Sequence, residues 1–106
     1  MRGDILKNHL ELLVLNALKE GPAHGYSVIS TIRERSGGEF ELLEGSLYPA
    51  LHRLERGGLL TSSWSEVGGR RRRVYTLSRK GRTVLAEQER DWRRFEQAMN
   101  LVLAER

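Results

Sequence analysis

The chain has no cysteine among its 106 residues. This absence excludes a disulfide framework and thiolate metal sites, and it fits a reducing cytoplasm, where we expect the protein to reside. No long apolar run is present, because the longest mostly apolar segment, Leu12 to Leu18, contains Asn16 and is too short to span a bilayer. The first residues include Asp4 and Lys7 and show no signal-peptide pattern. We therefore expect a soluble protein without a membrane partner.

Motifs of catalysis and metal binding are also missing from the sequence. Gly45-Ser46 is not embedded in a G-x-S-x-G motif, and no glycine-rich phosphate loop precedes a predicted helix. His9, His24 and His52 fall on different predicted elements without clustered carboxylates, so their spacing does not suit a metal. We expect a protein that is not an enzyme and that needs no cofactor or metal.

Positive charge is concentrated in one segment of the chain. The formal net charge is +4, yet Arg70 to Arg73 are followed by Arg79, Lys80 and Arg82, with no acidic residue between Glu66 and Glu87. A local positive field of this kind is typical of a nucleic-acid-binding protein, and a solvated charged face is the alternative. Strand alternation places Arg71 and Arg73 on the face opposite Arg70 and Arg72, so we expect only some of the four to contact DNA.

The length of the chain indicates a single domain, residues 1–106. A domain of this size buries roughly 65% of its unfolded surface, so the core is thin and a partner subunit would add to it. Apolar residues at helical spacing predict a first helix from about Asn8 to Lys19, ended by Gly21-Pro22. A second helix fits His24 to Arg35, with Gly37-Gly38 as its stop.

The third predicted helix has two contrasting faces. With Ser46 as N-cap, Pro49 takes the third helical position, where its missing N–H is harmless. One apolar stripe then consists of Leu47, Ala50, Leu51 and Leu54. The opposite face consists of Ser46, Pro49, His52, Arg53 and Arg56, with Tyr48 on the flank and Gly57-Gly58 as the terminator.

A β-hairpin and a long helix complete the predicted order. Leu59 to Val67 and Arg70 to Leu77 read as strands joined by Gly68-Gly69, with Trp64 and Tyr75 as the large residues available to anchor them. Ser78 is the predicted N-cap of a helix running from about Arg79 to Glu105. Its heptad seam comprises Leu85, Gln88, Trp92, Phe95, Met99 and Val102.

This order predicts a mainly α fold with a two-stranded β-wing, a winged helix-turn-helix followed by a long C-terminal dimerisation helix. Residues 8–78 form the DNA-binding part and residues 79–106 the dimerisation helix. In such an arrangement the third helix enters the major groove and the hairpin lies along the adjacent backbone. Arginine contacts with phosphate supply affinity, and side chains of the third helix meet the base edges.

Several motifs resemble the PadR family of bacterial transcriptional regulators. They are Gly21-Pro22-Ala23-His24-Gly25-Tyr26, the third-helix string from Glu44 to Glu55, Gly58-Leu59-Leu60, Arg73-Val74-Tyr75-Thr76-Leu77-Ser78, and Gly81. The resemblance covers about residues 6 to 95. Ser78 stands where such proteins more often have Thr. Serine also has the hydroxyl that caps a helix. A single helix after the wing resembles the short subfamily.

The resemblance implies a homodimer that binds a roughly palindromic operator, usually as a repressor. In the family the last helix packs against the first helix of the other subunit, and some members release DNA when a small molecule binds near this interface. Trp92 matches a tryptophan that can line a central aromatic pocket. The expected interface residues are Leu10, Leu13, Val14, Leu85, Trp92, Phe95, Met99 and Val102, and the expected contacts of a small aromatic or hydrophobic effector are Trp92 and Phe95.

Base-edge contact is expected from the third helix, and phosphate or minor-groove contact from the arginine run. In the alternative for the third helix, Tyr48 packs on the wing and only Arg53 contacts phosphate. Tyr26 either donates to a phosphate or caps the core. Trp92 is either part of the interface core or a residue that stacks on a ligand. The full set of expected DNA-binding residues is Tyr26, Ser46, Leu47, Tyr48, Pro49, His52, Arg53, Arg70, Arg71, Arg72, Arg73 and Tyr75.

Two other functions remain open from the sequence. A protein-interaction module would use the basic wing on an acidic protein and would bind duplex only non-specifically. A small-molecule carrier would use the dimer pocket as its main site. The sequence favours a DNA-binding regulator over both, because a cationic third helix and an arginine-rich hairpin occur together.

Overall fold

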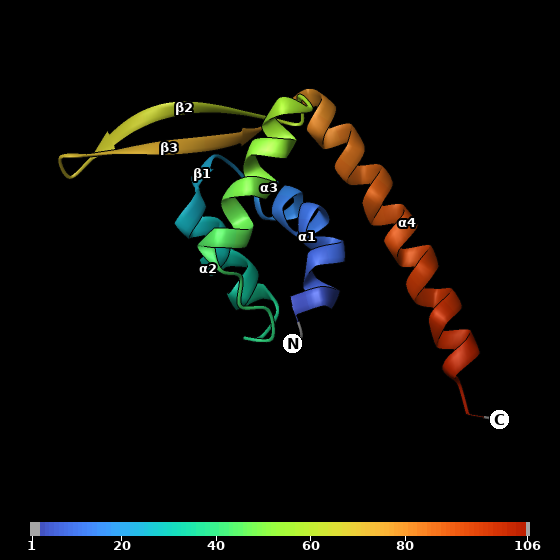
Figure 1. Cartoon of the computed structure of the whole chain (residues 1–106). Coiled ribbons are helices and arrows are strands. Elements are labelled where there is room, and N and C mark those ends of the chain that lie inside the picture. Colours follow the sequence, from blue (N-terminus) through green and yellow to red (C-terminus); the bar gives the residue numbers. More distant parts are fainter. Residues whose placement is uncertain (1–2, 106) are drawn as a thin grey trace.

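The computed structural model describes residues 3–105, and the helix, helix, helix, hairpin, helix order expected from the sequence is confirmed (Figure 1). Within these residues, no helix combines the length and apolar character needed to cross a membrane. In chain order the elements are α1 (Gly3–Ala17), β1 (Ala23–His24), α2 (Gly25–Arg35), α3 (Glu44–Arg56), β2 (Leu60–Val67), β3 (Arg70–Leu77) and α4 (Arg79–Leu103).

The first helix begins earlier than the predicted start near Asn8. Leu6 is buried and extends the apolar stripe of Leu10 and Val14 by one turn, which explains why the helix reaches back toward Gly3. At the start of α2, His24 is the N-cap, and its Nδ1 accepts a hydrogen bond from the backbone N–H of Ser27 at 3.4 Å. The prediction for α2 is therefore correct to within one residue.

A short strand, β1, was not predicted from the sequence. Ala23 and His24 pair antiparallel with Tyr75 and Val74 of β3, so the sheet has three strands in the order β1-β3-β2. Two residues are too few to show an alternating pattern, which explains why sequence periodicity did not reveal this strand. The pairing ties the start of α2 to the base of the wing.

The N-terminus of α3 differs from the prediction. Leu43, not Ser46, is the N-cap, and it makes no side-chain capping bond. The backbone N–H groups of Ser46 and Leu47 both donate to the Leu43 carbonyl at 3.0 Å. Pro49 is therefore the sixth helical residue, where it removes the hydrogen bond to the carbonyl of Gly45. Gly45 is exposed, so water can satisfy that carbonyl.

The hydrophobic core lies between the first three helices and the base of the sheet. The predicted stripe of α3, namely Leu47, Ala50, Leu51 and Leu54, is buried as expected. Around it pack apolar side chains of α1, the α1–α2 connection, α2, the loop before α3, the sheet and the start of α4, namely Leu6, Leu10, Val14, Leu15, Leu18, Val28, Ile32, Leu42, Leu60, Tyr75, Leu77 and Leu85.

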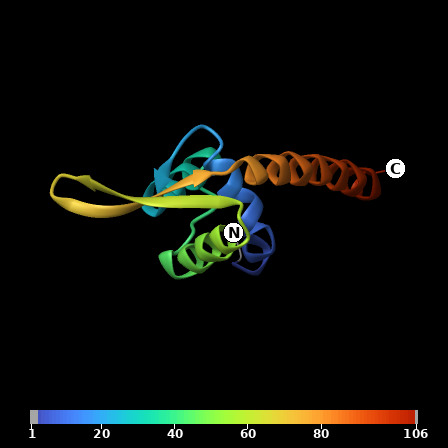
Figure 2. The ribbon, with the colours of Figure 1, turned by 90° about the horizontal axis from the view of Figure 1, so that it is seen from above.

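The wing extends away from this core as a twisted ribbon (Figure 2). Gly68 and Gly69 form its turn with φ values of 61° and 78°, the left-handed conformation that a two-residue hairpin turn requires and that glycine adopts without strain. Tyr75 is 1% exposed and anchors the base of the wing as predicted. Trp64 is 55% exposed, so its predicted anchoring role is wrong. It sits too far along the ribbon to reach the core.

The junction between the wing and α4 is closely packed. Ser78 caps α4 as predicted, because its Oγ accepts from the Gly81 N–H at 3.0 Å while its hydroxyl donates to the Gly58 carbonyl at 2.6 Å. A Cβ at Gly81 would stand 2.1 Å from the carbonyl oxygen of Leu59. Beyond this junction α4 diverges from the body (Figure 1). Residues 90–103 of α4 are exposed.

We expect Gly81→Ala to destabilise the fold, because the added Cβ meets backbone that cannot move without opening the junction. Overpacking of this kind typically costs about 1–3 kcal/mol, and a backbone clash places this site at the upper end. Gly45→Ala is the matched control, since nothing lies within 4 Å of its Cβ position. In urea unfolding at fixed protein concentration, the control should be neutral or up to about 1 kcal/mol more stable. Equal free energies of unfolding for both variants would contradict the close packing of Gly81 on Leu59.

Candidate nucleic-acid interface

The exposed side of α3 carries most of the α3 residues predicted to bind DNA. Ser46, Tyr48, Pro49, His52 and Arg53 are all exposed, so the helix presents a polar, partly cationic face above its buried stripe. Leu47 is fully buried in the core, so the prediction that its side chain contacts DNA is wrong. The physical reason is its place at the centre of the apolar stripe.

Arg53 lies on the flank of α3 that faces α1. Its Nε is 3.8 Å from Oε1 of Glu11, and both side chains are about half exposed. An ion pair this exposed contributes little, on the order of 0–1 kcal/mol, so the guanidinium can exchange Glu11 for another anion at small cost. Arg56, which follows His52 by one helical turn, is also exposed and extends the polar face. The sequence places Arg56 on this face, but it was not among the residues expected to bind DNA.

Tyr48 joins α3 to the start of α2. Its ring covers Gly25 so closely that a Cβ there would lie 2.8 Å from the tyrosine hydroxyl. Tyr48 therefore packs on α2 and stays partly exposed, and its contact with DNA stays a prediction. The neighbouring Tyr26 is 60% exposed, so it does not cap the core, and its hydroxyl remains available for a ligand.

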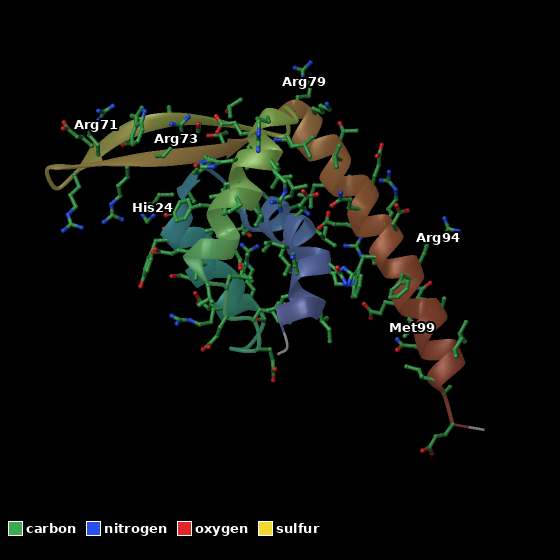
Figure 3. All side chains as sticks on the ribbon, viewed as in Figure 1. His24, Arg71, Arg73, Arg79, Arg94 and Met99 are labelled. Carbon is green, nitrogen blue, oxygen red and sulfur yellow. The ribbon has the colours of Figure 1, made fainter. Side chains whose placement is uncertain are left out.

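One face of the wing is organised around Trp64, and we call it the tryptophan face (Trp64, Glu66, Arg71 and Arg73). The guanidinium carbons of Arg71 and Arg73 lie 4.7 and 5.3 Å from the centre of the indole ring, within cation–π range (Figure 3). Arg73 Nε also donates to Ser62 Oγ at 2.9 Å. Its Nη2 lies 3.7 Å from a carboxylate oxygen of Glu55, which in turn accepts from the Ser62 hydroxyl.

The opposite face of the wing carries Arg70 and Arg72, and we call it the histidine face because Arg72 contacts His24. Nη1 of Arg72 lies 3.4 Å from Nε2 of His24, the residue that caps α2. Arg70 is exposed near the turn. The expected separation of the arginine run onto two faces is thus seen in its contacts, and the proximity of His24 to Arg72 had no signal in the sequence because 48 positions separate them.

Tyr75 was also expected to bind DNA, and its burial contradicts this. The side chain fills the base of the wing, where desolvation raises the pKa of its hydroxyl above the ordinary value of 10.0. Arg73 lowers the pKa, while Glu55 and Tyr48 raise it further. The hydroxyl therefore stays neutral and structural, and it cannot reach a duplex.

The second predicted site is the groove between α1 and α4. Trp92 packs edge-on against His9, with ring centres 5.1 Å apart, and its ring centre lies 5.7 Å from that of Phe95. Beside it lies an apolar groove of about 540 Å³. The residues that line this groove are Ile5, Leu6, His9, Leu12, Leu13, Asn16, Phe40, Glu89, Trp92 and Arg93.

The residues expected at the dimer interface fall into two groups. Leu10, Val14 and Leu85 are buried within the single chain, so their predicted contact with a second subunit is wrong. All three belong to the hydrophobic core of the single chain. Between α1 and α4, the Asn16 amide donates to Glu89 at 3.0 Å. The second group remains accessible to solvent. Leu13 is half-buried, and the exposed members are Trp92, Phe95, Met99 and Val102.

The sequence of the chain matches a described family over most of its length. Residues 14–87 match the family model for the transcriptional regulator PadR-like family. The chain belongs to the PadR-like family of transcriptional regulators. The match runs from α1 into α4, so the α3 face and the whole wing lie within the PadR-like segment. The family resemblance drawn from the sequence motifs is confirmed.

Relatives of known sequence and structure agree with this assignment. The transcriptional regulator Rv3488 of Mycobacterium tuberculosis is 38% identical over 81 residues, which cover 76% of this chain and 73% of the relative. The structure of a PadR family transcription regulator from Clostridium difficile superposes with a TM-score of 0.81 at 33% identity, covering 91% of this chain and 99% of that chain. The predicted winged-helix fold class is therefore confirmed.

A further PadR structure contains DNA. Bacillus subtilis PadR in complex with operator DNA is similar to this chain with a TM-score of 0.69 and 26% identity, covering 74% of this chain and 45% of that chain. Among the described residues of the PadR-like chain, no group of His, Asp or Glu side chains could hold a metal ion.

Proposed function

We propose that the protein is a homodimeric transcriptional repressor that binds a palindromic operator. In this proposal α3 enters the major groove and the arginine wing follows the backbone or the adjacent minor groove. The observation that carries it is the simultaneous exposure of the polar α3 face and of a wing that begins with four arginines, on one rigidly packed body. This charge and shape suit a duplex.

Three features support contact with duplex DNA in particular. Ser46, His52 and Arg53 supply hydrogen-bonding groups of the kind that read base edges, at the accessible side of a helix. The wing supplies cations that phosphates attract. The similar PadR of Bacillus subtilis is seen with operator DNA, which supports the same ligand class for this chain.

The exposed half of α4 supports a homodimer. Trp92, Phe95, Met99 and Val102 repeat at heptad spacing, and Val102 is 78% exposed in the single chain. A helix that presents this apolar ridge to water is stabilised when a second copy covers it. Pairing through α4 would place two α3 faces in a symmetric arrangement, as a palindromic site requires.

The groove beside Trp92 supports an effector site at the same interface. Its walls are mainly apolar, and Trp92 offers an indole edge to a planar ligand. A small aromatic or hydrophobic molecule bound there would contact α4. In the proposed dimer, the position of α4 sets the distance between the two α3 helices. Its binding would therefore change operator affinity by a coupling between the two sites.

For DNA recognition, we expect selection from a pool of random duplexes to yield one preferred palindromic site. Arg53→Ala should cost about 1–3 kcal/mol at that site and much less on random duplex, because a lost base contact affects discrimination. Arg94→Ala is the control, since Arg94 also carries one positive charge but projects from α4 away from the body (Figure 3). Gel-shift titrations measure both, and absence of any preferred site would contradict sequence-specific repression.

For the dimer, we expect Val102→Lys to shift the protein toward monomer in sedimentation velocity at micromolar concentration. Val102 makes no core contact in the single chain, so the substitution places a charge in the seam without disturbing the fold. Asn100→Lys introduces the same side chain off the seam and should leave the dimer intact. A wild-type protein that sediments as a monomer would refute the pairing.

For the effector, Trp64→Phe leaves Trp92 as the single tryptophan, because the chain has two. We expect p-hydroxycinnamic acid, used as a planar aromatic probe, to quench Trp92 fluorescence and to weaken operator binding over the same concentration range. Trp92→Ala should abolish the effect of the probe on DNA binding. Quenching with unchanged operator affinity would show that the groove and the DNA surface are not coupled.

A further inference from the structure

The two faces of the wing differ in net charge. Residues directly opposite each other in an antiparallel pair point to the same side of the ribbon, and the sides alternate along each strand. The register pairs Trp64 with Arg73 and Glu66 with Arg71, so these four residues share the tryptophan face. Arg70 and Arg72 alternate to the histidine face.

Carboxylates offset the arginines on the tryptophan face. Glu66 stands across the ladder from Arg71, and Glu55 of α3 lies 3.7 Å from Arg73. Two arginines therefore face two carboxylates. On the histidine face Arg70 and Arg72 pair with Val67 and Ser65, neither of which is acidic. A polyanion is attracted to the histidine face, because only there is the positive charge uncompensated.

The arginines of the tryptophan face are also held by other contacts. Arg73 bonds Ser62, pairs with Glu55 and lies over the Trp64 ring, on which Arg71 also lies. Reaching a phosphate would break these contacts. Arg72 makes a long contact of 3.4 Å with His24, which a phosphate oxygen can replace at small cost.

The histidine face is continuous with the rest of the DNA-binding surface. His24 caps α2 next to Gly25, which the ring of Tyr48 covers, and Tyr26 is exposed beside them. Figure 3 shows Arg71 and Arg73 on the side of the wing away from His24. A duplex lying against α3 and the start of α2 therefore meets the histidine face and not the tryptophan face.

We propose that the arginine run is divided in function by strand alternation. Arg70 and Arg72 bind backbone phosphates of the duplex. Arg71 and Arg73 are positioning residues that lie on Trp64, and Arg73, through Glu55, fixes the direction of the wing relative to α3. This division rests on the proposed DNA-binding function and specifies which side of the wing the duplex occupies.

Two charge-matched double variants test the division. Arg70→Ala with Arg72→Ala should reduce the slope of log affinity against log salt by about 1.8, because two phosphate contacts are lost. Duplex affinity should fall about a hundredfold at low salt. Arg71→Ala with Arg73→Ala removes the same charge but should change the slope by less than about 0.5. It should lower the thermal unfolding temperature, which the first pair should not.

A second measurement does not depend on the stability of the double variants. The chain has no cysteine, so Arg72→Cys and Arg71→Cys each introduce a single thiol. Iodoacetamide labelling is followed with and without saturating duplex in low salt. Bound duplex should slow alkylation at position 72 about tenfold or more and leave the rate at position 71 nearly unchanged.

Each result has a distinct meaning. Equal loss of salt slope in both double variants, or protection of the thiol at position 71, would overturn the division while leaving DNA binding in place. A wild-type protein that binds no duplex even at low salt would remove the proposed function, and the division with it. Slope loss confined to the first pair, with protection confined to position 72, supports the division.

Discussion

The close approach of Gly81 to the carbonyl of Leu59 is the constraint on which the rest of the structure depends. At that point the first turn of α4 rests on the backbone that joins α3 to β2, without an intervening side chain. Ser78 caps α4 and bonds Gly58 at the same place. The direction of the wing and the direction of α4 are therefore fixed relative to each other and to the end of α3.

This junction links the two surfaces that the proposed function uses. The wing and α4 leave it in different directions (Figure 1). The apolar ridge of α4 is exposed. The core between the wing and α4 is small. Few side chains therefore connect the exposed part of α4 with α3. The polar contacts of Asn16 with Glu89 and with Arg35 connect α4, α1 and α2.

Much of the fold could be predicted from residue patterns because the relevant interactions are local. The stripe from Leu47 to Leu54, the Gly68-Gly69 turn and the Ser78 cap each depend on residues within a few positions of one another. The start of α3 could not be predicted, because Leu43 caps it without a side-chain bond. Strand β1 is too short to have a pattern and exists only because β3 pairs with it.

For the candidate site, the sequence by itself determined which residue types are present and how they alternate, including a cationic hairpin and a heptad ridge on the last helix. Only the tertiary structure decided their accessibility. Leu47 and Tyr75 are adjacent in sequence to more accessible residues yet fill the core, and Leu10, Val14 and Leu85 are covered within one chain. Burial and the pairing of Arg72 with His24 depend on elements distant in sequence, and a pattern along the chain carries no record of which distant element lies opposite.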